Sequence, residues 1–324
     1  MTSNVQRASL GIVARSHLDR RPYKTTNRIP WRAGVLAVAM LFAMNSGAQA
    51  HGLAGERFFP ATILTDDPFV ADEGSLPTVT FSPTGPDGSQ ETDIGVDLSK
   101  RITRNLDFTL HTQWAQSHTV GAPTTTSWGG LDSGLQYQLF VNAPRESMGL
   151  VGLNVSWAGG PRNVTTLTPT FDFGKGFGEL PESLKFLRPL AVTSNLSFDF
   201  PTQTASAGAP NPNNFNYGFA FEYSLPYLQC CVKDVGLRHP FSQMIPLVEV
   251  AFSTPVNRNA GLGTTGTIQP GVIWSGRYYQ IGAEAIIPAN GATGHRLGGV
   301  VQLHWYLDDL FPHSIGQPIL RQKS

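Results

Sequence analysis

Charged residues and long apolar runs are both scarce in this chain of 324 residues. Only 14% of the residues are charged, and the longest apolar run, at 33–44, holds about 12 residues. A membrane-spanning helix needs roughly 20 consecutive apolar residues. If the chain sits in a membrane, it must therefore cross it with strands.

Cysteine is almost absent, with only the adjacent pair Cys230 and Cys231. Neighbouring cysteines cannot join distant parts of a fold, so the fold does not depend on disulfides. In an oxidising compartment the two could form a vicinal disulfide. The alternative is an incidental pair of thiols in a loop.

Catalytic and metal-binding motifs are also missing. The chain has no Gly-x-Ser-x-Gly elbow, His-Glu-x-x-His helix, phosphate-binding loop or Cys-x-x-Cys pair. A copper site at His51 would need a second histidine, and no other histidine has motif context. The acidic stretch 66–73 lacks calcium-loop spacing. We expect no enzyme activity, no cofactor and no metal.

The first fifty residues have the pattern of a cleaved signal peptide. Seven basic residues precede and adjoin the apolar run 33–44, and Ala48-Gln49-Ala50 forms a small-x-small site before His51. The alternative is an N-terminal anchor, for which the run is short. Because the basic region is unusually long, the true translation start could lie downstream of Met1.

Charge becomes unbalanced once residues 1–50 are removed. The whole chain carries 23 basic and 23 acidic residues, but seven of the basic and only one of the acidic residues lie before His51, which leaves the remainder near −6. A negative mature chain argues against nucleic acid as a partner.

Glycine, proline and phenylalanine are abundant, at 34, 24 and 19 residues. This composition favours many short strands joined by turns. Period-two alternation supports strands directly: in 215–223 every second residue is aromatic, and 190–200 alternates in the same way. Each segment therefore has one apolar and one polar face.

A soluble β-sandwich would also alternate. Three features favour a membrane barrel instead. Several segments reach the 9–11 residues of a tilted membrane strand, whereas soluble strands centre near five or six. Their polar faces nearly lack Lys and Arg, which a water-facing sheet carries. Aromatic residues gather near strand ends, as interfacial girdles do.

Twelve strands fit the alternation, with ten as the second choice because the first strand has the weakest pattern. Short turns alternate with longer loops, so we expect an all-β antiparallel transmembrane barrel with both termini in the periplasm. The domain limits are 1–50 for the signal peptide, 51–75 for a plug-like periplasmic segment, 76–307 for the barrel and 308–324 for a tail. The predicted strands cover residues 76–82, 91–100, 105–117, 127–141, 147–158, 165–174, 190–200, 215–225, 245–254, 267–275, 278–288 and 296–307.

Two connections at the periplasmic end are long. Residues 180–187 have the pattern of a short amphipathic helix that starts at a proline, and 226–244 contains the two cysteines. A helix at the membrane surface and a loop that caps the lumen would each explain the first connection.

Five segments carry a resemblance to a known family: HGLAGERFFP at 51–60, DDPFVADE at 66–73, LSKRIT at 98–103, 174–190 and HWYLDDLFP at 304–312. They resemble a family of proteobacterial outer-membrane proteins, near the barrels named for the MetA pathway of phenol degradation. The resemblance spans most of 51–320, implies an outer-membrane barrel and suggests transport, but it supplies no functional residues. The chain departs from many barrels by continuing past Trp305 to Ser324.

If the apolar row of each strand faces lipid, the polar row faces a lumen rich in carboxylates. Unpaired carboxylates in a dry interior are prohibitive, so either water fills the lumen or Arg57, Arg162, Arg188 or Arg277 reaches in to pair with them. The candidate lumen-facing residues are Asp93, Asp97, Asp107, His111, Gln113, Asp132, Asp172, Asp199, Glu222, Glu249, Glu284 and His304.

A watered acidic lumen would favour cations and neutral polar solutes. We therefore expect a channel or transporter in the cell outer membrane that contacts its lipid and passes or binds a small cationic or neutral solute. One alternative is a closed structural or adhesive barrel, with a lumen filled by its own side chains or by 51–75. A second is an outer-membrane hydrolase with a Ser/His or Asp/His pair at the barrel rim.

Overall fold

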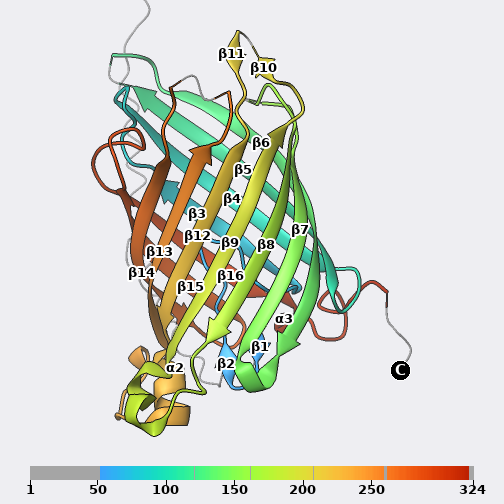
Figure 1. Ribbon diagram of the computed structural model, residues 1–324, viewed down its shortest axis with the longest axis vertical. Helices are drawn as coiled ribbons and strands as arrows, with labels where there is room; N and C mark the ends of the chain where they lie inside the picture. The colour runs from blue at the N-terminus through green and yellow to red at the C-terminus, as the bar shows by residue number, and fades with distance from the viewer. Residues whose placement is uncertain (1–51, 120, 161, 207, 259–260, 321–324) are drawn as a thin grey trace, which may run out of the picture. The chain divides into compact units, whose positions relative to one another are not determined.

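Twelve strands close into a single antiparallel barrel in the computed structural model (Figure 1). The structure describes residues 52–119, 121–160, 162–206, 208–258 and 261–320. The predicted signal peptide and His51 lie outside these ranges.

Each barrel strand pairs with its neighbours along the chain, and β3 pairs with β16 to close the ring. Closure leaves no open sheet edge, which is what a hydrocarbon environment demands of strands. The barrel strands are β3 (Glu73–Phe81), β4 (Ser89–Arg101), β5 (Leu106–Thr119), β6 (Thr125–Asn142), β7 (Ser147–Ser156), β8 (Thr166–Gly176), β9 (Leu190–Pro201), β12 (Asn214–Tyr223), β13 (Met244–Pro255), β14 (Thr265–Ser275), β15 (Tyr279–Pro288) and β16 (Gly298–Tyr306).

The prediction of an all-β barrel with twelve strands is confirmed, and ten strands is wrong. All twelve predicted segments coincide with a barrel strand to within a few residues. The alternative of a two-sheet sandwich is not the fold, because one closed sheet replaces the two stacked sheets.

Large apolar side chains are exposed around the outside of the barrel. Leu135, Phe221 and Val301 are 48–50% exposed, and each alternates with a buried or polar neighbour that points inward. A soluble protein rarely exposes so wide an apolar surface, whereas a membrane barrel carries such a band. We call this outer surface the lipid belt.

The remaining elements are short. They are β1 (Leu53–Ala54), β2 (Arg57–Phe58), β10 (Ala205–Ser206), β11 (Ala209–Pro210), the turns η1 (Ala143–Arg145), η2 (Glu182–Leu187), η3 (Leu228–Val232) and η4 (Phe241–Gln243), and the helices α2 (Leu225–Tyr227) and α3 (Leu307–Leu310). At the predicted helix 180–187 the structure has a 3₁₀ turn that follows Pro181 and is interrupted at Leu184. In the described ranges no helix is long and apolar enough to cross a membrane.

Residues 52–72 run inside the barrel, and we call them the inserted segment. Phe59, Phe69 and Ala71 pack with Met148 in one buried cluster. Phe58 packs against a second buried cluster of Ile245, Leu247 and Ile273. The inserted segment therefore has its own apolar seat on the inner wall.

The packing of the inserted segment shows that one expectation about the apolar faces of the strands was wrong. The apolar rows were predicted to face lipid on every strand, but Ile245 and Leu247 share a face with Glu249, since side chains alternate with period two. Leu247 and Glu249 are both buried. At this end of β13 both rows are apolar, because the inner one packs against protein rather than water.

Candidate functional site

One carboxylate on the barrel wall binds the inserted segment through hydrogen bonds. Glu249 of β13 accepts hydrogen bonds from the backbone N–H groups of Ile63 (2.8 Å), Leu64 (3.0 Å) and Thr65 (2.7 Å), and from the Thr65 hydroxyl (3.1 Å). Glu249 is fully buried. Four donors around one carboxylate stabilise its charge and fix the backbone of 63–65, since hydrogen bonds to ionised groups are strong.

Glycines on the inner wall make room for the same segment. A Cβ added at Gly218 would lie 2.7 Å from Thr65, one at Gly282 would lie 2.7 Å from Ile63, and one at Gly174 would lie 2.9 Å from Pro68. Such distances are far inside van der Waals contact, so side chains there would push the segment away. These glycines belong to the polar rows of β12, β15 and β8.

Polar wall residues make further contacts along the segment. The Gln138 side chain donates to Pro68 O (2.9 Å) and accepts from Val70 N–H (3.1 Å). Asn195 donates to Asp66 (3.1 Å), and Gln280 donates to the carbonyl of Ala61. Backbone groups that would otherwise need water are thus paired with the wall.

A buried arginine fixes the base of the inserted segment. Arg57 of β2 bonds to Glu146 (3.2 Å) and to the carbonyls of Pro189 (3.1 Å) and Arg188. Its guanidinium lies 3.8 Å from the centre of the Tyr227 ring. The side chains of Arg57 and Glu146 are both almost fully buried.

Tyr227 completes this network from outside the barrel strands. Its hydroxyl donates to Glu146 at 2.7 Å. Burial, and next the hydrogen bond to Glu146, raise the pKa of Tyr227 to about 12, so the phenol remains a donor at neutral pH. We call Arg57, Glu146 and Tyr227 the base network.

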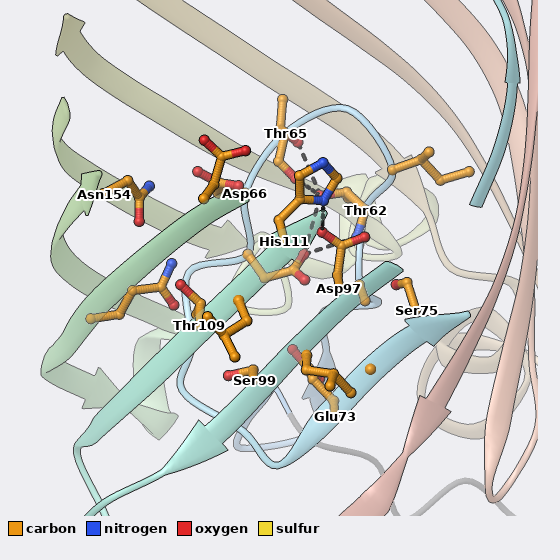
Figure 2. Close-up of a pocket in the computed structure, with 18 of the residues that line it drawn as sticks. Thr62, Thr65, Asp66, Glu73, Ser75, Asp97, Ser99, Thr109, His111 and Asn154 are labelled. Carbon is orange, nitrogen blue, oxygen red and sulfur yellow. Dashed lines mark hydrogen bonds and ion pairs between the residues drawn. The ribbon is translucent and has the colours of Figure 1, made fainter. Parts of the chain in front are cut away.

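Beside the inserted segment lies a cavity of about 530 Å³ (Figure 2). One side is formed by residues 61–67, and the other by the inner faces of the strands. Six carboxylates line it, against one arginine and two histidines. These ionisable residues are Asp66, Asp67, Glu73, Asp97, Asp132, Asp199, Arg162, His111 and His304.

Three of these carboxylates have a basic partner. Asp132 holds Arg162 through two contacts of 2.7 and 2.9 Å. The Asp97 carboxylate lies 2.5 Å from the Nδ1 atom of His111. Figure 2 shows the two side chains pointing toward each other. Glu73 lies 3.2 Å from the Nε2 atom of His304.

The other three carboxylates bond only to neutral groups within the described residues. Asp66 accepts from Asn195, Asp67 accepts from Thr62 N–H (2.8 Å), and Asp199 accepts from the Thr168 hydroxyl (2.9 Å). The cavity therefore carries an excess of negative charge.

The predicted lumen residues lie in three regions. The cavity brings together Asp97, His111, Asp132, Asp199 and His304, and Asp172 lies beside it, 2.5 Å from Asn195. Glu222, Glu249 and Glu284 are buried on the wall that holds the inserted segment. The remaining three lie outside both regions: Asp107 accepts from Ser99, and Asp93 and Gln113 lie farther along β4 and β5.

The sequence left open whether arginines pair with the lumen carboxylates. Arg162 pairs with Asp132 of the predicted set, whereas Arg57 pairs with Glu146, which was not predicted. Arg188 instead pairs with Glu182 in η2, and Arg277 lies over the ring of Tyr278. The sequence prediction missed Glu146 and Glu73 because each stands at the edge of a strand, where alternation gives no direction.

His304 also contacts a serine. Its Nδ1 atom lies 2.9 Å from the Ser75 hydroxyl while its Nε2 atom faces Glu73, and all three residues line the cavity. Across the described ranges no group of three or more His, Cys, Asp or Glu is placed to hold a metal ion. Cys230 and Cys231 form a disulfide within η3.

The comparisons with known proteins identify no family for this chain. No family model and no curated protein matches the chain. Solved structures that match include the NanC porin (8% identity, 72% of this chain and 98% of that one, TM-score 0.46) and the KdgM porin (8%, 72% and 98%, 0.45). The beta domain of the Bordetella autotransporter BrkA also matches (12%, 73% and 99%, 0.42). At these identities the likeness concerns the fold alone.

Proposed function

We propose that this chain is an outer-membrane barrel that binds or passes a small cationic or neutral polar solute, without catalysis. The observation that carries the proposal is the acidic cavity inside a barrel with an apolar exterior. The chain would reach the outer membrane through a cleaved signal peptide and keep both termini in the periplasm. Its relation to the MetA-pathway barrels is part of the proposal, supported by the segments quoted above.

Electrostatics favour such a solute. Six carboxylates face one arginine and two histidines across the cavity. A low-dielectric wall focuses the field of the unpaired carboxylates into the aqueous space, so cations concentrate there and anions are repelled. Rings of carboxylates select cations in channels for the same reason.

The inserted segment determines whether a solute passes or only binds. Leu64 and Thr65 line the acidic cavity and also a second cavity of about 320 Å³, formed with residues of β12, β13 and β14. The tip of the segment therefore stands between the two spaces. We propose that a solute passes from one space to the other when residues 61–67 move away from the wall.

Liposome swelling tests the charge preference. We expect vesicles that contain the refolded protein to swell faster in lysine than in glutamate of equal concentration. Asp66→Asn combined with Asp199→Asn should bring the two rates together, because it removes two unpaired cavity charges. Asp87→Asn removes the same charge from an exposed loop carboxylate and should change neither rate. Faster swelling in glutamate would contradict the proposal.

A hydrolase is the second candidate, and one observation favours it. Ser75, His304 and Glu73 form a hydrogen-bonded chain at the cavity wall, which is the arrangement of a nucleophile, a base and an orienting carboxylate. A fluorophosphonate probe would label Ser75 in such an enzyme, and Ser75→Ala would abolish the labelling. The non-catalytic proposal expects no labelling of the wild-type protein.

A closed structural barrel is the third candidate, and the packing of the inserted segment favours it. In a structural barrel the segment would stay in place permanently. Neither lysine nor glutamate would then enter the vesicles, even when the contacts of the segment with Glu249 are removed.

A further inference from the structure

A compact group of turns extends from the barrel end where β9 and β13 begin. It consists of η2, α2, η3, η4 and their connections, appears at the lower end of the barrel in Figure 1, and is called the foot here. Leu184, Phe186 and Leu187 of η2 are 44–50% exposed, and Phe241 of η4 is 58% exposed. An exposed apolar surface on so small a unit is typical of a site that contacts an apolar partner.

The first contact between the foot and the barrel lies on the outer wall. Tyr223 is the last residue of β12 and follows Glu222, which points inward and is buried. Alternation therefore places Tyr223 on the same outward row as the exposed Phe221. The Tyr223 hydroxyl donates to the carbonyl of Phe186 at 3.0 Å. Phe186 thus adjoins the lipid belt directly.

The second contact lies two strands away. Trp274 of β14 follows the inward, fully buried Ile273, so it points outward. The ring of His239 lies 5.8 Å from the ring of Trp274. Since His239 comes shortly before η4, Phe241 also lies close to the outer wall.

Aromatic rings continue the row from Trp274 along this end of the barrel. Tyr279 lies 5.5 Å from Trp274, and Trp305 lies 5.7 Å from Tyr279, measured between ring centres. Such rows of aromatic rings occupy the boundary between hydrocarbon and headgroups in membrane barrels. Trp274 and Tyr279 are only 5% and 7% exposed, so protein covers these two rings, and the foot meets the wall at the level of this boundary.

The charged side chains of η2 are paired with one another, so they do not prevent η2 from lying at the membrane boundary. Glu182 pairs with Lys185 (2.6 Å) and with Arg188 (3.3 Å). These pairs leave the apolar side chains as the dominant feature of the turn. Segments with this composition bind membranes by burying their apolar face at the headgroup boundary.

We propose that the foot is a membrane anchor: Leu184, Phe186, Leu187 and Phe241 insert into the lipid leaflet that surrounds this end of the barrel. The occupant of this surface is phospholipid, because the surface continues the lipid belt through Tyr223 and Trp274. The inference rests on the barrel spanning a membrane and is independent of solute passage.

Photo-crosslinking to lipid tests the anchor. The full chain is refolded into phosphatidylcholine vesicles that contain an analogue with a diazirine in its acyl chain. After illumination, mass spectrometry maps the lipid adducts. We expect adducts on peptides that contain 184–187 and 241, as well as on the outward row of β12. The exposed Leu262 lies in a loop beyond β13 and should remain unlabelled.

Serine variants provide the control. Leu184→Ser combined with Phe186→Ser and Leu187→Ser should reduce labelling of the peptide that contains 184–187 to the level of the Leu262 loop, while Leu262→Ser should leave it unchanged. Adducts on β12 without adducts on the wild-type foot would overturn the anchor while leaving the barrel in the membrane. If β12 itself remains unlabelled, the membrane placement fails, and the anchor fails with it.

Discussion

Replacing Glu249 with alanine should open the barrel and raise the time-averaged conductance per protein several-fold. The change leaves three backbone N–H groups and one hydroxyl of the inserted segment without their acceptor. Losing hydrogen bonds to a charged acceptor costs about 3 kcal/mol. That loss shifts the ratio of inserted to displaced segment by roughly 100-fold. Planar-bilayer recording of the refolded variant measures the effect.

Asp87→Ala is the control for Glu249→Ala. It removes an exposed loop carboxylate whose hydrogen bonds come from Ser89 rather than from the inserted segment. We expect its conductance to stay close to that of the wild-type protein. Equal conductance in the Glu249 variant and the wild type would show that Glu249 does not hold the segment in place.

Replacing Arg57 with methionine should release the base of the inserted segment. Methionine retains much of the side-chain volume but leaves Glu146 buried without its cation. Breaking a buried ion pair in this way costs about 3–5 kcal/mol. We expect amide hydrogen exchange at residues 53–58 to accelerate by a factor of about 100 or more, because 1.4 kcal/mol corresponds to a tenfold change in an equilibrium.

Two variants make the Arg57 result specific. Arg277→Met removes an exposed arginine that also lies over a tyrosine ring, and it should leave exchange at 53–58 unchanged. Adding Glu146→Gln to Arg57→Met should recover part of the protection, since it removes the uncompensated charge. Unchanged exchange in Arg57→Met, or no recovery in the double variant, would contradict the role of the base network.

The strands could be predicted because membrane barrels repeat one simple pattern. Segments such as 190–200 and 215–223 alternate over their whole length, and the structure forms β9 and β12 there. Alternation also gives the direction of each side chain relative to its neighbours. The polar rows of the candidate residues followed from this one rule.

The seat of the inserted segment could not be predicted in the same way. Residues 59–72 have no periodicity, and Thr65 meets Glu249 across 184 positions of the chain. Gly218 and Gly282 looked like small members of polar rows, yet each makes room for a side chain of the segment. One signal was present: at 245–250 both rows of β13 are apolar apart from Glu249, which is typical of a strand buried on two sides.

The reversal potential of the Glu249→Ala variant across a KCl gradient tests the central claim most directly. Its sign reports which ion crosses the opened lumen, and therefore whether the inner rows form an acidic passage that the segment normally fills. We predict a cation-selective current larger than that of the wild-type protein. An anion-selective current, or the absence of any current through the variant, would contradict the account.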